Sequence, residues 1–405
     1  MNIPDFCLYR RLTILLLFAI ASSHATSATP LKMESVSVQT AAHMLLTPQT
    51  VVATADDGIV VGGGSSASKE TWAVKFDAAN RLQWQYTRQA PPAERQAVIE
   101  GASPSSYHGV AEMADGSFFL CAEKPFNRSG LPASMYLTHL NRDGQLLGEL
   151  PISSNSIATG RNFFLAGCAA WGGNLAVLAY EMSWPPGPVM GLGRLTYLLL
   201  VFEPSGAVKW ELPVASFQAG TAPDPDGVVF QETGASLTVS ATGNVSTELM
   251  RFRASGEISA HRKAAGRQLL VHRHAGTAAL KLLGLSIEAD GYQHTLTVLD
   301  DDLAPVSAVS AGHPAAFLVS SVFEKADGTL LMFGSEVNRE GTRQRAGIRQ
   351  VAASLDAELP LATAFAQFKD PFSIVTATLR RNGEAFAYAT AAEPRDPGVV
   401  VNFIK

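Results

Sequence analysis

The sequence predicts an all-β fold, and three observations support this prediction. One short pattern, an apolar pair, a polar residue, a large apolar residue and then a polar turn, recurs seven times along the chain. Asp-Gly and Asn-Gly dipeptides such as Asp57-Gly58 and Asn382-Gly383 stand between apolar, β-rich segments, as in tight hairpins. Hydrophobic residues make up 47% of the sequence and charged residues only 17%, a composition that favours one large core.

The recurring pattern divides the chain into blades. Its large apolar positions lie 47 to 64 residues apart. This is slightly longer than the roughly 40 to 50 residues of a four-stranded propeller blade, and insertions in the loops account for the excess. We therefore expect residues 29–405 to form a single seven-bladed β-propeller. Six or eight blades remain alternatives, because the segment Leu280–Ile287 is apolar without clear alternation. The seven anchor residues, each on a predicted strand, are Phe76, Leu140, Phe202, Phe252, Leu299, Leu355 and Phe403.

Turn residues support this register. Gly144, Gly206 and Gly256 each follow an anchor by four positions, where a hairpin needs a residue that tolerates positive φ, and Asn80 takes this place in the first blade. A fourth strand follows each of the first six anchors, but the chain ends directly after the seventh. Because an unpaired edge promotes aggregation, we expect Leu31–Val38 to pair with the last strand and close the ring.

The first 28 residues are typical of a signal peptide. Arg10 and Arg11 precede an apolar run of about ten residues, too short to span a bilayer, and small residues follow it. We expect cleavage after Ala25 or Ala28, no stable membrane insertion, and a periplasmic or secreted product. Cys7 precedes the apolar run, so it is not placed to carry a lipid.

Two cysteines remain after removal of the leader, Cys121 and Cys168. In an oxidising compartment they either form a disulfide or stay as two separate buried thiols, and the sequence leaves both possibilities open. His272 and His274 share one face of a predicted strand and, with His294, are candidate metal ligands. Their basic surroundings favour a solvated surface instead, so we expect no metal and no cofactor.

The segments Val74-Lys75-Phe76-Asp77 and Leu82-Gln83-Trp84 resemble the blade pattern of bacterial secreted β-propeller repeat proteins, of a type without the Trp-Asp repeat signature. Trp210 recurs at the offset of Trp84. The resemblance covers nearly the whole mature chain and implies a scaffold rather than a particular activity.

Long insertions are predicted on one face of the ring and tight turns on the other. Long loops on a rigid scaffold are common binding sites. The segment with Trp184, Pro186, Val189 and Met190 combines side chains that are favoured at interfaces with prolines that limit the entropy lost on binding. We therefore expect a monomer that binds a protein partner through this face, with these four residues as contacts, as an immunity or inhibitor protein would.

No motif for a catalytic nucleophile, phosphate-binding loop or zinc protease occurs, so we expect no catalytic residues. The net charge of −5 gives no field that would attract nucleic acid. Two alternatives remain: a hydrolase or lactonase-like enzyme with a site in the central channel, and a carbohydrate or small-molecule binder.

Overall fold

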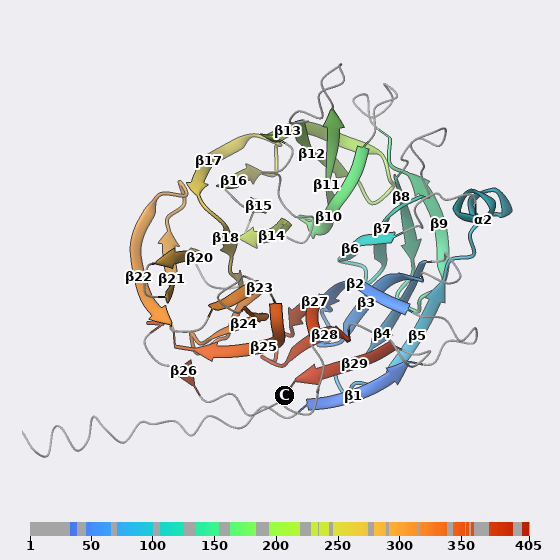
Figure 1. The fold of residues 1–405 in the computed structure, drawn as a ribbon. Helices are drawn as coiled ribbons and strands as arrows, with labels where there is room; N and C mark the ends of the chain where they lie inside the picture. Colours follow the sequence, from blue (N-terminus) through green and yellow to red (C-terminus); the bar gives the residue numbers. More distant parts are fainter. Residues whose placement is uncertain are drawn as a thin grey trace, which may run out of the picture.

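A computed structural model of the chain confirms the all-β propeller (Figure 1). It describes residues 33–38, 46–65, 71–99, 106–124, 135–153, 163–183, 194–218, 228–233, 235–242, 246–273, 279–288, 291–313, 316–337, 343–352, 354–355, 358–359, 372–391 and 399–404. The predicted signal peptide and its cleavage sites lie outside these residues.

Each of the first four blades is a sheet of four consecutive antiparallel strands, and the first strand lies nearest the centre of the ring and the fourth at its rim (Figure 1). The first blade contains β2 (Leu46–Ala53), β3 (Ile59–Ser65), β4 (Thr71–Phe76) and β5 (Leu82–Thr87), and the second contains β6 (Ser106–Glu112), β7 (Phe118–Glu123), β8 (Met135–Leu140) and β9 (Leu146–Pro151). The third contains β10 (Phe163–Trp171), β11 (Asn174–Ser183), β12 (Arg194–Phe202) and β13 (Val208–Gln218), and the fourth contains β14 (Val228–Thr233), β15 (Ser236–Thr242), β16 (Ser246–Arg253) and β17 (Ile258–Ala265).

The second half of the ring is less regular. The fifth blade contains β18 (Gln268–Leu270), β20 (Leu280–Glu288), β21 (Gly291–Leu299) and β22 (Pro305–His313), and the sixth contains β23 (Ala316–Glu324), β24 (Leu330–Val337), β25 (Arg343–Val351) and β26 (Glu358–Leu359). The two-residue strand β19 (His272–Arg273) leaves the fifth blade and pairs in parallel with β23. One further sheet, the closing sheet, joins β27 (Phe372–Leu379), β28 (Ala385–Ala391) and β29 (Val399–Ile404) to β1 (Met33–Val38).

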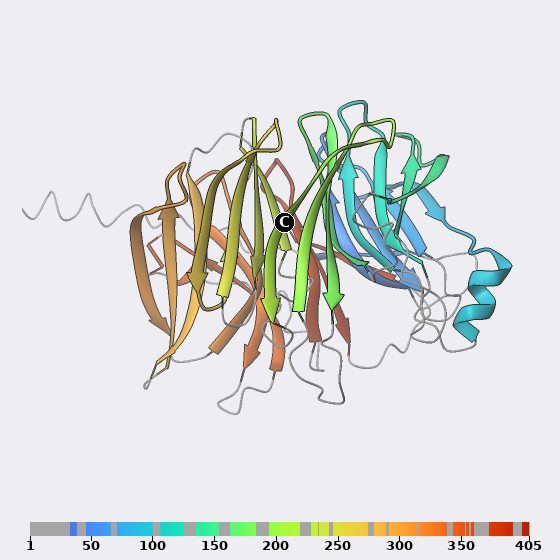
Figure 2. The ribbon, with the colours of Figure 1, turned by 90° about the horizontal axis from the view of Figure 1, so that it is seen from above.

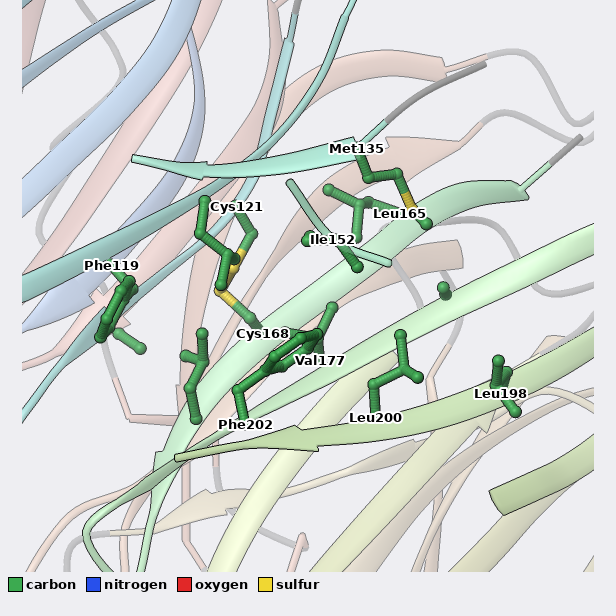
Figure 3. Close-up of a cluster of buried hydrophobic side chains, with 14 of the residues drawn as sticks. Phe119, Cys121, Met135, Ile152, Leu165, Cys168, Val177, Leu198, Leu200 and Phe202 are labelled. Carbon is green, nitrogen blue, oxygen red and sulfur yellow. A yellow bond between two sulfur atoms is a disulfide. The ribbon is translucent and has the colours of Figure 1, made fainter. Parts of the chain in front are cut away.

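The core lies between neighbouring blades. The middle strands are covered on both faces, so every side chain of β4 and β7 is buried, whereas β9 at the rim is mostly exposed. This explains why a middle strand such as β7 is apolar at nearly every position instead of alternating. One such cluster fills the space between the second and third blades with Phe119, Leu165, Leu200 and their neighbours (Figure 3).

The tight turns follow the predicted chemistry, with two differences. Gly144, Gly206 and Gly256 have φ between +77° and +88°, and Asn80 takes the same conformation. At Asp57-Gly58, however, the residue with positive φ is Asp57. Glycine at position 58 has a different reason, since a Cβ there would lie 2.3 Å from the Phe76 carbonyl oxygen. In the fifth blade Leu303 takes this conformation (φ 61°), and its buried side chain packs in the core as compensation for the strain.

Two predicted anchors are wrong in register. Leu355 is not on a strand: β25 ends at Val351, which pairs with Leu330 as the other anchors pair with their second strands, and Leu355 lies in the following turn with φ 61°. In the closing sheet Ile404, not Phe403, pairs with the first residue of the second strand, Ala385. In both places neighbouring apolar residues match the pattern equally well, so hydrophobicity alone does not select the register.

The two ends of the chain meet in the closing sheet. β1 is its outer strand and pairs antiparallel with β29, from Met33 opposite Ile404 to Val38 opposite Val399. The buried guanidinium of Arg380, which follows β27, donates hydrogen bonds to the carbonyl oxygens of Asp77 (3.2 Å) and Ala78 (3.3 Å) in the first blade. The closing sheet is thereby joined to both ends of the chain and to the first blade.

Candidate partner-binding face

The two faces of the ring differ in how they connect the strands. On one face the connections are tight turns of a common form, in which the first residue donates to the carbonyl of the fifth and the fourth donates to the carbonyl of the first. These turns include Asp77–Arg81, Asn141–Gln145, Glu203–Ala207, Arg253–Glu257, Asp300–Ala304, Lys325–Thr329 and Arg380–Glu384. At the opposite ends of the strands the connections of the first three blades are longer, whereas some in the fourth and fifth blades, such as 243–245 and 289–290, are as short as turns. Figure 2 shows the ring from the side, with one face at each end of the strands. We call the face with the longer connections the loop face.

The predicted contact residues belong to a connection on the loop face. Trp184, Pro186, Val189 and Met190 lie outside the described residues, but the ends of their segment are placed: Ser183 closes β11, Arg194 opens β12, and the two are antiparallel partners. The described residues on either side of 184–193 therefore lie side by side, at the ends of two paired strands of the third blade. We call residues 184–193 the 184–193 segment.

Aromatic side chains support β11 and β12. The rings of Phe164 and Tyr180 stack at 5.4 Å, and the ring of Tyr180 lies 5.5 Å from that of Tyr197. Burial raises the pKa of Tyr180 to about 12, and the negative charge of Glu123 acts in the same direction. Tyr180 therefore stays protonated at physiological pH and serves as a neutral aromatic support.

Glu123 connects the second blade to the third. Its buried carboxylate accepts a hydrogen bond of 2.6 Å from the backbone N–H of Leu165 and lies 3.6 Å from Nε2 of His108. A backbone N–H at this distance holds the carboxylate in place. Glutamines fill a similar role elsewhere in the ring, since Gln49 accepts from the Tyr107 N–H and Gln231 from the Arg273 N–H.

A disulfide lies close to Glu123. Cys121 on β7 and Cys168 on β10 are bonded, with their Cα atoms 6.5 Å apart, and so link the second and third blades covalently (Figure 3). Gly109 permits this approach, because a Cβ there would lie 2.5 Å from the Cys168 nitrogen. The third blade, to which the 184–193 segment belongs, is thus cross-linked to the second blade.

An ion-pair network that the sequence analysis did not identify holds the helix α2 (Pro92–Ile99) against the rim (Figure 1). Arg88 is buried, donates to Glu94 on α2 at 2.7 Å and to Glu149 on β9 at 2.6 Å, and lies over the ring of Tyr136 at 4.5 Å. These carboxylates raise the pKa of Arg88 further above its usual value. No local pattern in the sequence links Arg88 to Glu149.

The basic stretch around residue 273 is not simply solvated, as the sequence had suggested. Arg273 is buried and pairs with the buried Glu324, which also accepts from Lys281 at 2.7 Å. His272 stacks on Phe323 at 4.8 Å, and burial lowers its pKa to about 4. His274 lies outside the described residues.

Two observations concern small-molecule and metal sites in the described parts of the chain. There, no group of three or more His, Cys, Asp or Glu side chains is arranged to hold a metal ion. A cavity of about 10 Å³ between the fifth and sixth blades has room for roughly one water molecule. Its lining includes Leu269, Leu283, His294 and Val319.

Comparison with known proteins yields similarity in fold only. No family model matches the sequence, and no curated protein matches it. Among solved structures, the Dos1 propeller is 9% identical with a TM-score of 0.48, over 89% of this chain and 78% of that one. The β-propeller domain of the Trilobed protease from Pyrococcus furiosus is 9% identical with a TM-score of 0.48, over 91% and 96% of the two chains. An acylaminoacyl peptidase is 10% identical with a TM-score of 0.42, over 87% and 52%. Similarities at this level carry no argument about activity.

Within the described residues, no helix is both long and apolar enough to cross a membrane.

Proposed function

We propose that this protein is an exported, non-catalytic β-propeller that binds a protein partner through its loop face, with Trp184, Pro186, Val189 and Met190 as contact residues. The observation that carries the proposal is the asymmetry between the two faces. Short turns close one end of the blades, and all of the long connections, including the 184–193 segment, leave the other end, mainly in the first three blades. An immunity or inhibitor protein is the form of partner binding that this arrangement suits.

The support beneath the 184–193 segment favours binding. The disulfide and the Glu123–Leu165 hydrogen bond join the second and third blades, and the aromatic stack of Tyr180 joins neighbouring strands within the third blade. A rigid base lowers the entropy that a binding loop loses when it meets its partner. The disulfide is also compatible with a periplasmic or secreted location.

We further propose that the closing sheet counts as a seventh blade. It contains four strands in antiparallel order, as the first four blades do. A ring of seven blades also matches the seven copies of the sequence repeat.

The function is tested in two steps. Affinity purification of the tagged mature protein from its native periplasm, followed by mass spectrometry, identifies a partner, and binding is then measured with both proteins purified. Trp184→Ala combined with Met190→Ala should weaken binding about thirtyfold or more, because truncation of a buried Trp anchor costs about 2 kcal/mol. The melting temperature should stay within a few degrees of the wild type.

A loop replacement provides the matched control. Because Ser183 and Arg194 are paired, residues 184–193 can be replaced by an Asn-Gly turn without disturbing β11 and β12. The control variant shortens residues 125–134, the connection of the second blade, to a Gly-Ser linker. Loss of binding in the first variant and retention in the second supports the proposal. Full-strength binding by a folded protein that lacks the 184–193 segment contradicts it.

A further inference from the structure

The turn between β27 and β28 contains the only Asn-Gly dipeptide of the sequence, Asn382-Gly383. In such a dipeptide the backbone nitrogen of glycine readily attacks the side chain before it, because glycine has no side chain to shield the nitrogen and its backbone rotates freely. Asn382 is exposed, and a Cβ at Gly383 would contact nothing within 4 Å. Both groups that would react therefore lie in open surroundings.

One hydrogen bond in this turn favours the attack and another delays it. The backbone N–H of Glu384 donates to Oδ1 of Asn382 at 2.9 Å, and Oδ1 is the atom on which negative charge develops when the side-chain carbonyl is attacked. The backbone N–H of Gly383 donates to the Arg380 carbonyl oxygen at 3.0 Å, and this bond has to open before the nitrogen attacks. Local opening of an exposed turn costs much less free energy than unfolding of the whole protein. The folded state therefore slows the reaction without preventing it.

Three other described asparagines that lie in or beside turns lack this combination. Asn80 and Asn141 each precede an arginine, and Asn174 precedes a leucine, so a side chain stands next to the backbone nitrogen in each case. Asn80 is also buried, with 5% of its surface exposed. Among these positions, only Asn382 joins an exposed amide to a following glycine.

We propose that Asn382 is a site of spontaneous deamidation, and that the product weakens the closure of the ring. The Gly383 nitrogen forms a bond to Cγ of Asn382, the bond from Cγ to the side-chain nitrogen breaks, and ammonia leaves with the former amide proton of Gly383. Water then opens the cyclic imide at either of its carbonyl groups, which gives aspartate or isoaspartate. Water is the only co-reactant. The site is separate from the loop face and does not depend on the proposed function.

The consequence for closure follows from Arg380, which begins the same turn. Its backbone N–H donates to the Glu384 carbonyl oxygen at 2.8 Å, and its guanidinium donates to the Glu384 carboxylate at 3.0 Å. The same guanidinium donates to the carbonyl oxygens of Asp77 and Ala78 in the first blade. In isoaspartate the main chain runs through the former side chain and is one methylene longer. The longer turn displaces the group that joins the closing sheet to the first blade.

Mass spectrometry of the mature protein tests the modification. The folded wild type is incubated in mildly alkaline buffer and then digested with pepsin at acidic pH, where deamidation during the digest is slow. The peptide with residue 382 should gain the mass of an amide-to-acid conversion at least about tenfold faster than peptides with Asn141 or Asn174, because only Asn382 precedes glycine. Electron-transfer fragmentation distinguishes isoaspartate from aspartate, and wild type unfolded in urea is the positive control. No gain at residue 382 in the folded protein overturns the proposal.

Differential scanning calorimetry tests the consequence. Wild type in which most of residue 382 is converted should melt at least about 3 °C below the fresh protein. Asn382→Ser is the matched control, because its hydroxyl accepts the Glu384 N–H but it has no amide to lose, and its melting temperature should not change on the same incubation. Asn382→Asp has the new charge without the longer main chain and should melt within about 1 °C of the fresh wild type. Unchanged melting of the converted protein, or an equal loss in Asn382→Ser, overturns the link to ring closure.

Discussion

Cys121 and Cys168 show how two residues on different blades can stiffen the ring. They are 47 positions apart in the chain, and the bond between them closes a loop that would otherwise be free in the unfolded state. Such a cross-link stabilises a protein mainly by restricting its unfolded chain, typically by about 2 to 4 kcal/mol.

We therefore expect the free energy of unfolding to fall by about 2 to 4 kcal/mol in Cys121→Ala/Cys168→Ala, measured by urea denaturation. Wild type unfolded in the presence of a reductant is the control, since it keeps both sulfur atoms and separates loss of the bond from loss of packing. The oxidised wild type should show no free thiol after denaturation. Two titratable thiols would refute the bond.

His272 makes stability depend on pH. Burial holds its pKa at about 4 in the folded protein, whereas a histidine in the unfolded chain has a pKa near 6.5. Between these values the unfolded state binds the proton and the folded state does not, so stability is lost as the pH falls from 6.5 towards 4.

Because His272 is partly exposed, we expect the loss to be on the order of 2 kcal/mol rather than the full linkage value. His272→Phe, which keeps a ring against Phe323, should flatten the dependence of unfolding free energy on pH in this window. His139, whose pKa is also lowered by burial, is present in both proteins and therefore contributes equally to the pH dependence of their unfolding free energies. An identical pH dependence in the two proteins would contradict the assignment.

Between blades, turn residues and outer strands fit one another. A Cβ at Gly144 would lie 2.5 Å from the ring of Trp84 on the preceding blade, and one at Gly256 would lie 3.0 Å from Trp210. In the fourth blade, Ala260 takes the place that Trp84 and Trp210 have in their blades. The turn residue of the next blade is then Leu303 instead of glycine, and Ala260 and Leu303 pack in the same cluster. The glycines thus serve the packing between blades as well as the turn.

Two glycine substitutions separate these effects. Gly144 (φ +77°) and Gly328 (φ +82°) have the same strained conformation, but a Cβ at Gly328 would contact nothing within 4 Å. Gly328→Ala should cost about 1 kcal/mol for the positive φ alone. Gly144→Ala should cost roughly 1 to 3 kcal/mol more, because the methyl group meets Trp84.

Chemical denaturation measures both variants, and Trp84→Leu in the Gly144→Ala background should recover part of the additional loss. Equal destabilisation by the two alanines would show that packing against Trp84 is not a constraint.

The ring as a whole is closed by strands from the two ends of the chain. β1 covers the outer edge of β29, and Arg380 joins the closing sheet to the first blade. Without β1, the sheet would have three strands and an exposed edge.

A mature protein that begins at residue 39 should therefore melt at least about 5 °C below one that begins at residue 29, and should aggregate more readily on heating. Differential scanning calorimetry of the two forms makes the comparison, with the longer form as the control for removal of the signal peptide. Superimposable melting curves would show that β1 is dispensable for closure.

Local chemistry in the sequence was sufficient to predict the all-β propeller, the tight turns and the pairing of the N-terminal strand with the last. The turns depend on residues that are close in the chain, and the propeller on a sequence repeat whose length is near that of one blade. The pairing of the N-terminal strand follows from the number of predicted strands, which leaves the last blade one strand short. The same information failed at Leu355 and Phe403, because neighbouring apolar residues satisfy one short pattern in more than one register.

Only the tertiary structure decided which distant residues meet. It bonds Cys121 to Cys168, buries Arg88 between Glu94 and Glu149, and pairs Arg273 with Glu324. In the sequence these charged residues look like ordinary surface residues, because burial depends on which blade covers them and not on their neighbours in the chain.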